Sequence, residues 1–130
     1  MKIKSSQTLV SEALNQIKTL SPAEALEMVN SDKCNLIDIR DIRERQKLGF
    51  IPRSFHAPRG MLEFWVDPES PYFKSIFDSD KKYVFHCAAG WRSALAVSTL
   101  KDMGFEATHI SDGFAGWLNE KGPVEFKNKK

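Results

Sequence analysis

Residues 84–97, VFHCAAGWRSALAV, lead from an apolar segment through a cysteine and three small residues into a helical pattern. The apolar segment, 82–86, is short and rich in aromatic and β-branched residues, which is typical of a buried strand. Apolar residues recur at helical spacing over 92–103. The stretch therefore predicts a strand–turn–helix unit in which Cys87 follows the strand and Arg92 opens the helix.

The segments on either side of this unit alternate in the same way. Two further buried strands are predicted at 35–39 and 107–110. Ser21 and Pro22 predict the start of one helix, and Gly104 predicts the end of the helix over 92–103. The other helical segments are predicted at 7–16, 22–29, 42–48, 60–66 and 113–120. Strands that alternate with helices indicate an α/β domain with a mostly parallel sheet.

The composition is that of one globular domain: 130 residues, 42% hydrophobic and 28% charged. A net charge of +2 is too small to favour nucleic acid or a membrane as partner. Polar residues interrupt the N-terminal segment, so neither a signal peptide nor a membrane anchor is expected. Cys34 and Cys87 are expected to be free thiols in the cytoplasm. The predicted division is a helical extension at 1–19, the main domain at 20–126 and a basic tail at 127–130.

Cys87 is predicted to lie where a strand meets the N-terminus of a helix, at the edge where open α/β sheets bind ligands. The next residues, Ala88, Ala89 and Gly90, are small, and Gly90 can adopt positive φ. Such a turn lets backbone amides bind an anion and stabilise a thiolate. Cys87 is therefore predicted to be a reactive nucleophile, with a buried structural cysteine as the alternative. No ligand spacing indicates a metal site, and no cofactor is expected.

Two segments resemble the active-site half of a single-domain rhodanese, a family of sulfurtransferases: HCAAGWRSALAVSTLKDMGF (86–105) and HISDGFAGWL (109–118). The family's Asp-x-Arg, Glu and Gly-x-Ile-Pro segment resembles LIDIRDIRERQKLGFIP (36–52), and a linking region of one bacterial subgroup is similar to HAPRGMLEFWVDPESPYF (56–73). Three residues of the turn after Gly49 depart from the family pattern: Phe50, Arg53 and Ser54. The resemblance implies a rhodanese-like three-layer domain, with a mostly parallel central sheet flanked by helices on both faces.

The resemblance also implies how the turn acts. Rhodaneses have a six-residue loop counted from the cysteine, here Cys87 to Arg92, and the loop of related cysteine phosphatases is one residue longer. The shorter ring is expected to surround the outer sulfur of a persulfide and to be too narrow for a tetrahedral phosphate. The implied reaction is a double displacement in which Cys87 takes sulfur from an anionic donor such as thiosulfate and passes it to cyanide or a thiol.

The expected substrate site is the loop itself, made of Ala88, Ala89, Gly90, Trp91, Arg92 and Ser93. Arg92 is expected to attract the donor and support the thiolate, more through its charge than through its planar fork. Trp91 is expected to line the mouth of the site, and Ser93 to cap the helix or donate to the loop. The alternatives are simple packing for Trp91 and a solvated helix-start residue for Arg92.

The remaining polar residues are expected to have lesser roles. The resemblance marks three of them as framework charges: Asp38, Arg40 and Glu44. Arg59 and Arg53 are candidates for the entrance, with surface solvation as the alternative. His86 is expected to point away from Cys87, because successive side chains of a strand alternate. His56 and His109 show no partner pattern.

Three other functions fit parts of the same pattern. A persulfide carrier, or sulfur-relay module acting with a protein partner, would use the same loop and turn over small donors slowly. A phosphatase or arsenate reductase is disfavoured by the four-residue gap between Cys87 and Arg92. A non-catalytic rhodanese module is disfavoured by the presence of Cys87.

Overall fold

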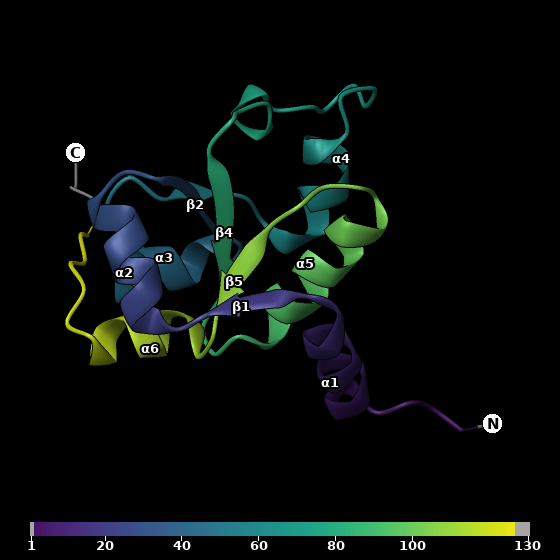
Figure 1. Cartoon of the computed structure of the whole chain (residues 1–130), viewed down its shortest axis with the longest axis horizontal. Helices are drawn as coiled ribbons and strands as arrows, with labels where there is room; N and C mark the ends of the chain where they lie inside the picture. The colour runs from purple at the N-terminus through teal and green to yellow at the C-terminus, as the bar shows by residue number, and fades with distance from the viewer. Residues whose placement is uncertain (1, 127–130) are drawn as a thin grey trace.

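A five-stranded sheet forms the centre of the molecule in the computed structural model, which describes residues 2–126 (Figure 1). Its strands are β1 (Lys18–Leu20), β2 (Cys34–Asp38), β3 (Phe55–His56), β4 (Lys82–His86) and β5 (Thr108–Ile110). The order across the sheet is β1-β5-β4-β2-β3, and each of these strand pairs is parallel. The predicted α/β class with a parallel sheet is therefore confirmed.

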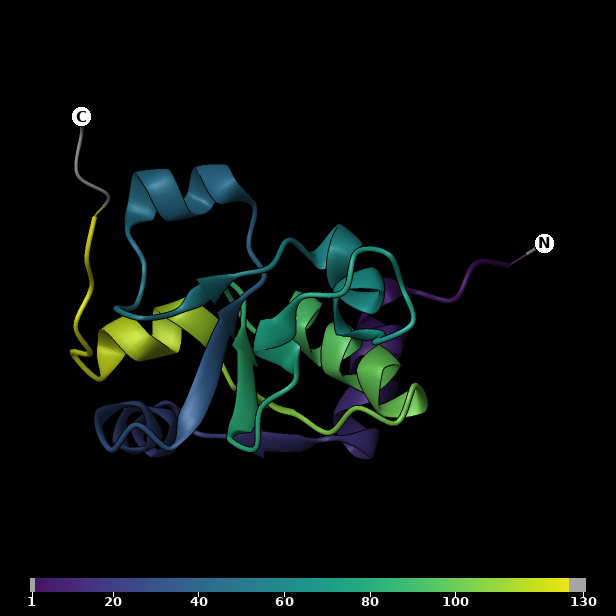
Figure 2. The ribbon, with the colours of Figure 1, turned by 90° about the horizontal axis from the view of Figure 1, so that it is seen from above.

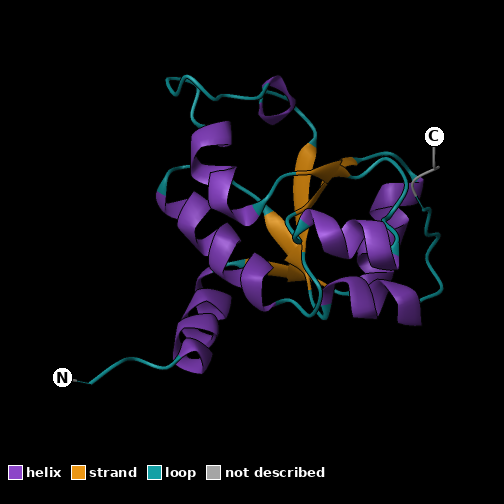
Figure 3. Cartoon of the chain, turned by 180° about the vertical axis from the view of Figure 1, so that it is seen from behind, coloured by secondary structure: helices purple, strands orange, loops and turns teal. Residues whose placement is uncertain are grey.

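Helices cover both faces of the sheet, as Figures 2 and 3 show. The helices are α1 (Ser6–Gln16), α2 (Pro22–Asn30), α3 (Ile42–Leu48), α4 (Leu62–Val66), α5 (Trp91–Asp102) and α6 (Gly113–Asn119). Two 3₁₀ turns lie at Arg59–Met61 and Ser75–Phe77. Helices α1 and α5 pack together on one face, and α2 and α6 pack together on the other. No helix within residues 2–126 is long and apolar enough to cross a membrane.

Local signals in the sequence set several of these boundaries. Helix α2 begins with a capping box, in which Glu24 N donates to the Ser21 hydroxyl at 3.1 Å and Ser21 N donates to the Glu24 carboxylate at 2.8 Å. Helix α5 ends before Gly104, whose φ is +92°, and Phe105 N donates to Leu100 O at 2.9 Å in the Schellman pattern. Both ends were predicted from these residues.

The two edge strands, β1 and β3, were not predicted. Each is only two or three residues long, and neither has the alternating or apolar pattern of a buried strand. Strand β1 pairs with β5, and α1 packs on α5, so residues before 20 complete one edge of the sheet. The predicted boundary at 19/20 falls within β1, and the predicted basic tail at 127–130 lies outside the described residues.

A buried ion pair holds the carboxyl end of β2. Asp38 and Arg40 are both fully buried, and the guanidinium donates to the two carboxylate oxygens at 3.0 and 2.8 Å. Arg40 also donates to the Gly49 carbonyl at 2.9 Å, which ties the segment after α3 to the end of β2. Burial raises the pKa of Asp38, but hydrogen bonds and charges from Arg40 and His86 outweigh it and hold the pKa at about 2.

Replacing Asp38 by asparagine should destabilise the fold strongly. The substitution leaves the Arg40 charge buried without its carboxylate, which costs about 3–5 kcal/mol. The matched control is Asp32→Asn, at an exposed aspartate that pairs with Lys81 and Arg53 and whose φ of +57° suits asparagine. Urea unfolding should show a large fall in stability for Asp38→Asn and almost none for Asp32→Asn. Equal losses in both variants would contradict a special role for the buried pair.

Candidate active site

The turn between β4 and α5 forms a cradle around the sulfur of Cys87. The Sγ atom accepts hydrogen bonds from the backbone amides of Gly90, at 3.2 Å, and Ser93, at 3.4 Å. Gly90 is the N-cap of α5 and has a φ of +98°, a left-handed conformation that favours glycine. The amides at the start of α5 thus point at the sulfur, where they favour negative charge.

Helix α6 fixes the outer side of the same turn. Phe114 N donates to Cys87 O at 2.8 Å, and Ala115 N donates to Ala88 O at 3.2 Å. In a trans peptide the carbonyl and the following amide point in opposite directions. Because the Cys87 and Ala88 carbonyls face α6, the amides of Ala88 and Ala89 face away from it. Gly113 allows this close approach, since a Cβ there would lie 2.5 Å from Cys87 O.

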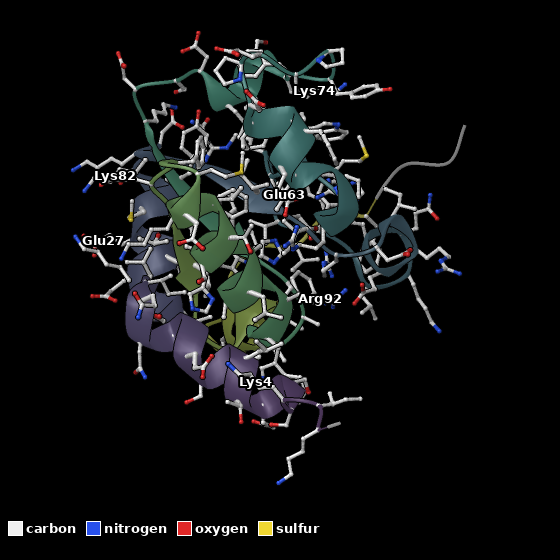
Figure 4. All side chains as sticks on the ribbon, turned by 90° about the vertical axis from the view of Figure 1, so that its right-hand side faces the viewer. Lys4, Glu27, Glu63, Lys74, Lys82 and Arg92 are labelled. Carbon is white, nitrogen blue, oxygen red and sulfur yellow. The ribbon has the colours of Figure 1, made fainter. Side chains whose placement is uncertain are left out.

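Arg92 lies in the first turn of α5 (Figure 4), and it pairs with Glu44 of α3. Its two terminal nitrogens donate to the two carboxylate oxygens at 2.9 and 3.0 Å. The hydrogen bond that Arg92 donates to Glu44 raises the pKa of Arg92 against the effect of burial, and attraction to Cys87 adds to the rise. That Arg92 acts on the donor and the thiolate more through its charge than through its fork stays a prediction, and the fork has a further role because it joins α3 to the cradle.

Ser93 does not cap α5, because Gly90 occupies the N-cap position. Its buried hydroxyl lies 3.6 Å from the Cys87 Sγ, 3.4 Å from the Gly90 carbonyl oxygen and 2.9 Å from His109 Nδ1. The other ring nitrogen of His109 lies 3.1 Å from the Thr19 hydroxyl. Burial lowers the pKa of His109 to about 4, so the ring is neutral at neutral pH.

His109 and Thr19 were not singled out from the sequence. His109 pairs with Phe85 in the sheet register, which places its side chain on the same face as Cys87, two residues after Phe85 and just past the end of β4. Thr19 enters through β1, a strand that the sequence did not predict. The register between parallel strands is the missing information, since no local pattern in either segment specifies it.

His86 points to the opposite face from Cys87, as expected. Its ring stacks on Phe114 of α6, and its Nε2 lies 3.8 Å from the Asp38 carboxylate. Burial lowers the pKa of His86, and the nearby Asp38 charge opposes that shift only in part. His86 is therefore a packed residue beneath the loop and not a base acting on the thiol.

Both candidates for the entrance of the site, Arg53 and Arg59, form ion pairs with carboxylates. Arg53 donates to Asp32, at 3.5 Å, and to the Val29 carbonyl, at 3.2 Å, near the amino end of β2. It does not line the entrance, which corrects one of the two entrance candidates. Arg59 pairs with Glu63 one turn further on, at 3.0 Å, so its place at the entrance stays a prediction.

The two cysteines lie at opposite ends of the sheet. Cys34 begins β2, four residues or about 13 Å along the strand from Asp38. Asp38 pairs with His86, the residue immediately before Cys87. Burial raises the pKa of Cys34, which makes its thiol a poor nucleophile. Both cysteines are free, and the amides of the turn between β4 and α5 donate to Cys87.

The described part of the chain, 2–126, contains no group of three or more His, Cys, Asp or Glu residues placed to hold a metal ion.

Trp91 is 61% exposed at the first position of α5, where it borders the loop. The arrangement is that of a buried cysteine sulfur that accepts hydrogen bonds from two backbone amides at a helix N-terminus, with Arg92 in the same turn.

Comparisons with known proteins agree on a family. A model described as a Rhodanese-like domain matches residues 21–120. YtwF of Bacillus subtilis, named as a candidate sulfurtransferase, is 31% identical over 109 residues, which are 83% of this chain and 97% of that protein. The thiosulfate sulfurtransferase GlpE of Glaesserella parasuis is 26% identical over 108 residues, 82% of this chain and 92% of that protein.

A solved structure from Rhodopseudomonas palustris, RPA3614, is similar over almost the whole chain. It is described as a protein of unknown function and possible tyrosine phosphatase. The sequence identity is 46% and the TM-score is 0.92, with 96% of this chain and 97% of that chain covered. The likeness includes the N-terminal region that lies before the family match.

The charge of Arg92 can be tested at Cys87 without any assumption about the reaction. In a Cys34→Ser background, Cys87 is alkylated with anionic iodoacetate and with neutral iodoacetamide. Arg92→Ala should lower the ratio of the two rates roughly three- to tenfold, the effect of one nearby charge in partly solvated surroundings. Arg92→Lys should retain most of the ratio, and Glu44→Gln should raise it because a neighbouring negative charge is lost.

The control is Arg43→Ala, which removes an exposed cation that pairs with Asp41 on the same helix as Glu44. This variant should leave the ratio unchanged. A ratio that is the same in wild type and in Arg92→Ala would contradict an electrostatic role for Arg92.

Proposed function

This chain belongs to the rhodanese-like domain family, and we propose that it moves sulfane sulfur from thiosulfate, or a similar anionic donor, to a thiol or cyanide acceptor through a persulfide on Cys87. The observation that carries the proposal is the pair of amides, from Gly90 and Ser93, that point at the Cys87 sulfur. The naming of GlpE as a thiosulfate sulfurtransferase supports the choice of donor.

The proposed reaction has two displacements. The Cys87 thiolate attacks the outer sulfur of thiosulfate, an Sγ–S bond forms, and the sulfur–sulfur bond of the donor breaks so that sulfite leaves with the electron pair. The acceptor thiolate or cyanide then attacks the outer sulfur of the persulfide, and the Cys87 thiolate leaves. Each step exchanges one sulfur-centred bond for another, so no external oxidant or reductant is required.

The cradle favours both charged species on this path. Amides at the N-terminus of α5 stabilise the thiolate before attack, and they stabilise it again as the leaving group of the second step. The same ring can surround the outer sulfur of a persulfide, which carries negative charge at neutral pH. Arg92 adds a positive charge that attracts the anionic donor.

A tyrosine phosphatase is the second candidate, because the similar structure from Rhodopseudomonas palustris is described as a possible one. The loop counts against it. Four residues separate Cys87 from Arg92, one fewer than in the related phosphatases. Gly90 also has little room to move outward, since a Cβ there would lie 3.3 Å from Asp112 N. We therefore favour a single sulfur atom over a tetrahedral phosphate as the occupant.

The cellular setting is a further part of the proposal. Both cysteines are free thiols, which suits the reducing cytoplasm. A persulfide carrier that passes sulfur to a partner protein would use the same loop, and it differs in rate and not in chemistry. High turnover with small donors and acceptors supports the enzyme, whereas a long-lived persulfide with slow turnover supports the carrier.

Sulfur transfer should depend on one of the two thiols only. Cys87→Ser should abolish thiosulfate:cyanide turnover while the protein remains folded by circular dichroism. Cys34→Ser should keep most of the activity, because Cys34 lies at the far end of β2 and has no ring of amides around it. Steady-state thiocyanate formation measures both variants. Comparable losses in the two would indicate that Cys34 takes part in the reaction and would overturn the single-thiol account.

A loop of this length is expected to give almost no phosphatase activity. Hydrolysis of p-nitrophenyl phosphate should be close to background for the wild type. Insertion of one glycine after Gly90 lengthens the ring by a residue and should weaken sulfur transfer. A gain of phosphate hydrolysis on insertion would support loop size as the selective feature. Robust hydrolysis by the wild type that is lost in Cys87→Ser would contradict it.

A further inference from the structure

A chain of hydrogen-bonded groups leads from the Cys87 sulfur to the edge of the sheet. The Ser93 hydroxyl lies 3.6 Å from Sγ and 2.9 Å from His109 Nδ1. His109 Nε2 lies 3.1 Å from the Thr19 hydroxyl. The chain thus joins α5, β5 and β1, and it starts at the nucleophile.

The middle of this hydrogen-bonded series is closed to water, but its far end, at Thr19, is open to solvent. Ser93 and His109 are 0% and 1% exposed. Thr19 is an exposed residue of the edge strand β1, where its partner in the register is His109 itself. A proton that reaches the Thr19 hydroxyl can therefore pass to solvent. Thr19 lies before the family match, which covers residues 21–120.

Few charged groups lie near the hydrogen-bonded series of Ser93, His109 and Thr19. His109 meets Ser93 from α5 and Thr19 from β1, and burial alone lowers its pKa to about 4. On the Cys87 side, Arg92 of α5 is the nearby cation, and Glu44 of α3 pairs with it. The buried charges of Asp38 and Arg40 and the partly buried charge of Arg45 lie around His86, on the face opposite Cys87.

Every group in the chain can both donate and accept. A hydroxyl has one proton and two lone pairs, and a neutral imidazole donates from one nitrogen while it accepts at the other. In one direction, the Cys87 thiol donates to Ser93, Ser93 donates to Nδ1, and Nε2–H donates to Thr19. In the reverse direction, Thr19 donates to Nε2, Nδ1–H donates to Ser93, and Ser93 donates to the Cys87 thiolate.

We propose that Ser93, His109 and Thr19 form a proton relay that carries the Cys87 thiol proton to solvent at the β1 edge. The S–H bond breaks, and its proton goes to the Ser93 oxygen. The Ser93 proton goes to His109 Nδ1, the Nε2 proton goes to Thr19, and the Thr19 proton goes to water. His109 remains neutral, because it gains a proton at one nitrogen as it releases one from the other.

The geometry of the relay does not depend on the proposed function, but its purpose rests on that function. Cys87 is only 1% exposed, and in the proposed reaction an anionic donor occupies the solvent side of the loop. A route behind the sulfur lets the thiol lose its proton without crossing that side. The reversed chain also turns the Ser93 hydroxyl toward the thiolate, which adds a third donor to the Gly90 and Ser93 amides.

The test follows the tautomer of His109 while Cys87 titrates. The full-length reduced protein is labelled with ¹⁵N in its histidines, and His109→Gln assigns the resonances of residue 109. At a pH where Cys87 is a thiol, Nε2 should carry the proton. At a pH where Cys87 is a thiolate, Nδ1 should carry it, and the midpoint of this change should coincide with that of iodoacetamide alkylation of Cys87. Ser93→Ala and Cys87→Ser should each abolish the change.

An imidazole that keeps one tautomer throughout the Cys87 titration would overturn the relay, as would one that becomes doubly protonated. The measurement involves no sulfur transfer. A protein that shows the tautomer change without turnover would therefore support the relay and contradict the proposed function. Turnover without the tautomer change would support the proposed function and contradict the relay.

Thr19 is a positioning residue, and its contribution separates a relay from simple packing. Thr19→Val keeps the shape of the side chain and removes the hydroxyl. The alkylation midpoint should rise by roughly half a unit to one unit, a three- to tenfold smaller thiolate fraction at fixed pH. Thr19→Ser should restore it. The control is Thr108→Val on β5. The Thr108 hydroxyl contacts the Tyr83 carbonyl and is not part of the relay. A midpoint unchanged in Thr19→Val would overturn the exit at Thr19.

Discussion

The shortness of the turn between β4 and α5 is the constraint on which the site depends. Helix α6 binds the outward carbonyls of Cys87 and Ala88, so the amides that follow them face the other way. Gly90, in a left-handed conformation, then brings the first turn of α5 close enough for two amides to reach the Cys87 sulfur. The ring is small because α6 holds its outer carbonyls while the first turn of α5 holds its sulfur.

Two ion pairs hold the elements that surround this ring. The buried pair of Asp38 and Arg40 joins the end of β2 to the segment after α3, and the Arg40 guanidinium also lies 4.2 Å from the centre of the Phe114 ring of α6. The half-buried pair of Glu44 and Arg92 joins α3 to the first turn of α5. Framework and candidate site are therefore not separate sets of residues, since the arginine in the first turn of α5 also fixes a neighbouring helix.

Much of this arrangement could be predicted from the sequence, because it is encoded locally. The strand–cysteine–small-residue–arginine order fixed the position of Cys87, and the bounds 42–48 and 82–86 were predicted as they are observed. The edge strands could not be predicted, because two or three residues carry no periodicity. The chain from Ser93 to Thr19 could not be predicted either, because it depends on the register of β1 and β5. Arg53 was misplaced because the path of the segment after α3 depends on tertiary contacts with Asp32 and Val29.

The central claim is that the ring around Cys87 holds one transferable sulfur atom. Intact-protein mass spectrometry after incubation with thiosulfate, or with 3-mercaptopyruvate as an alternative donor, tests it most directly. The account predicts a mass increase of one sulfur atom that maps to Cys87, disappears on addition of cyanide and is absent in Cys87→Ser. No adduct with either donor, or an adduct that maps to Cys34, would contradict it.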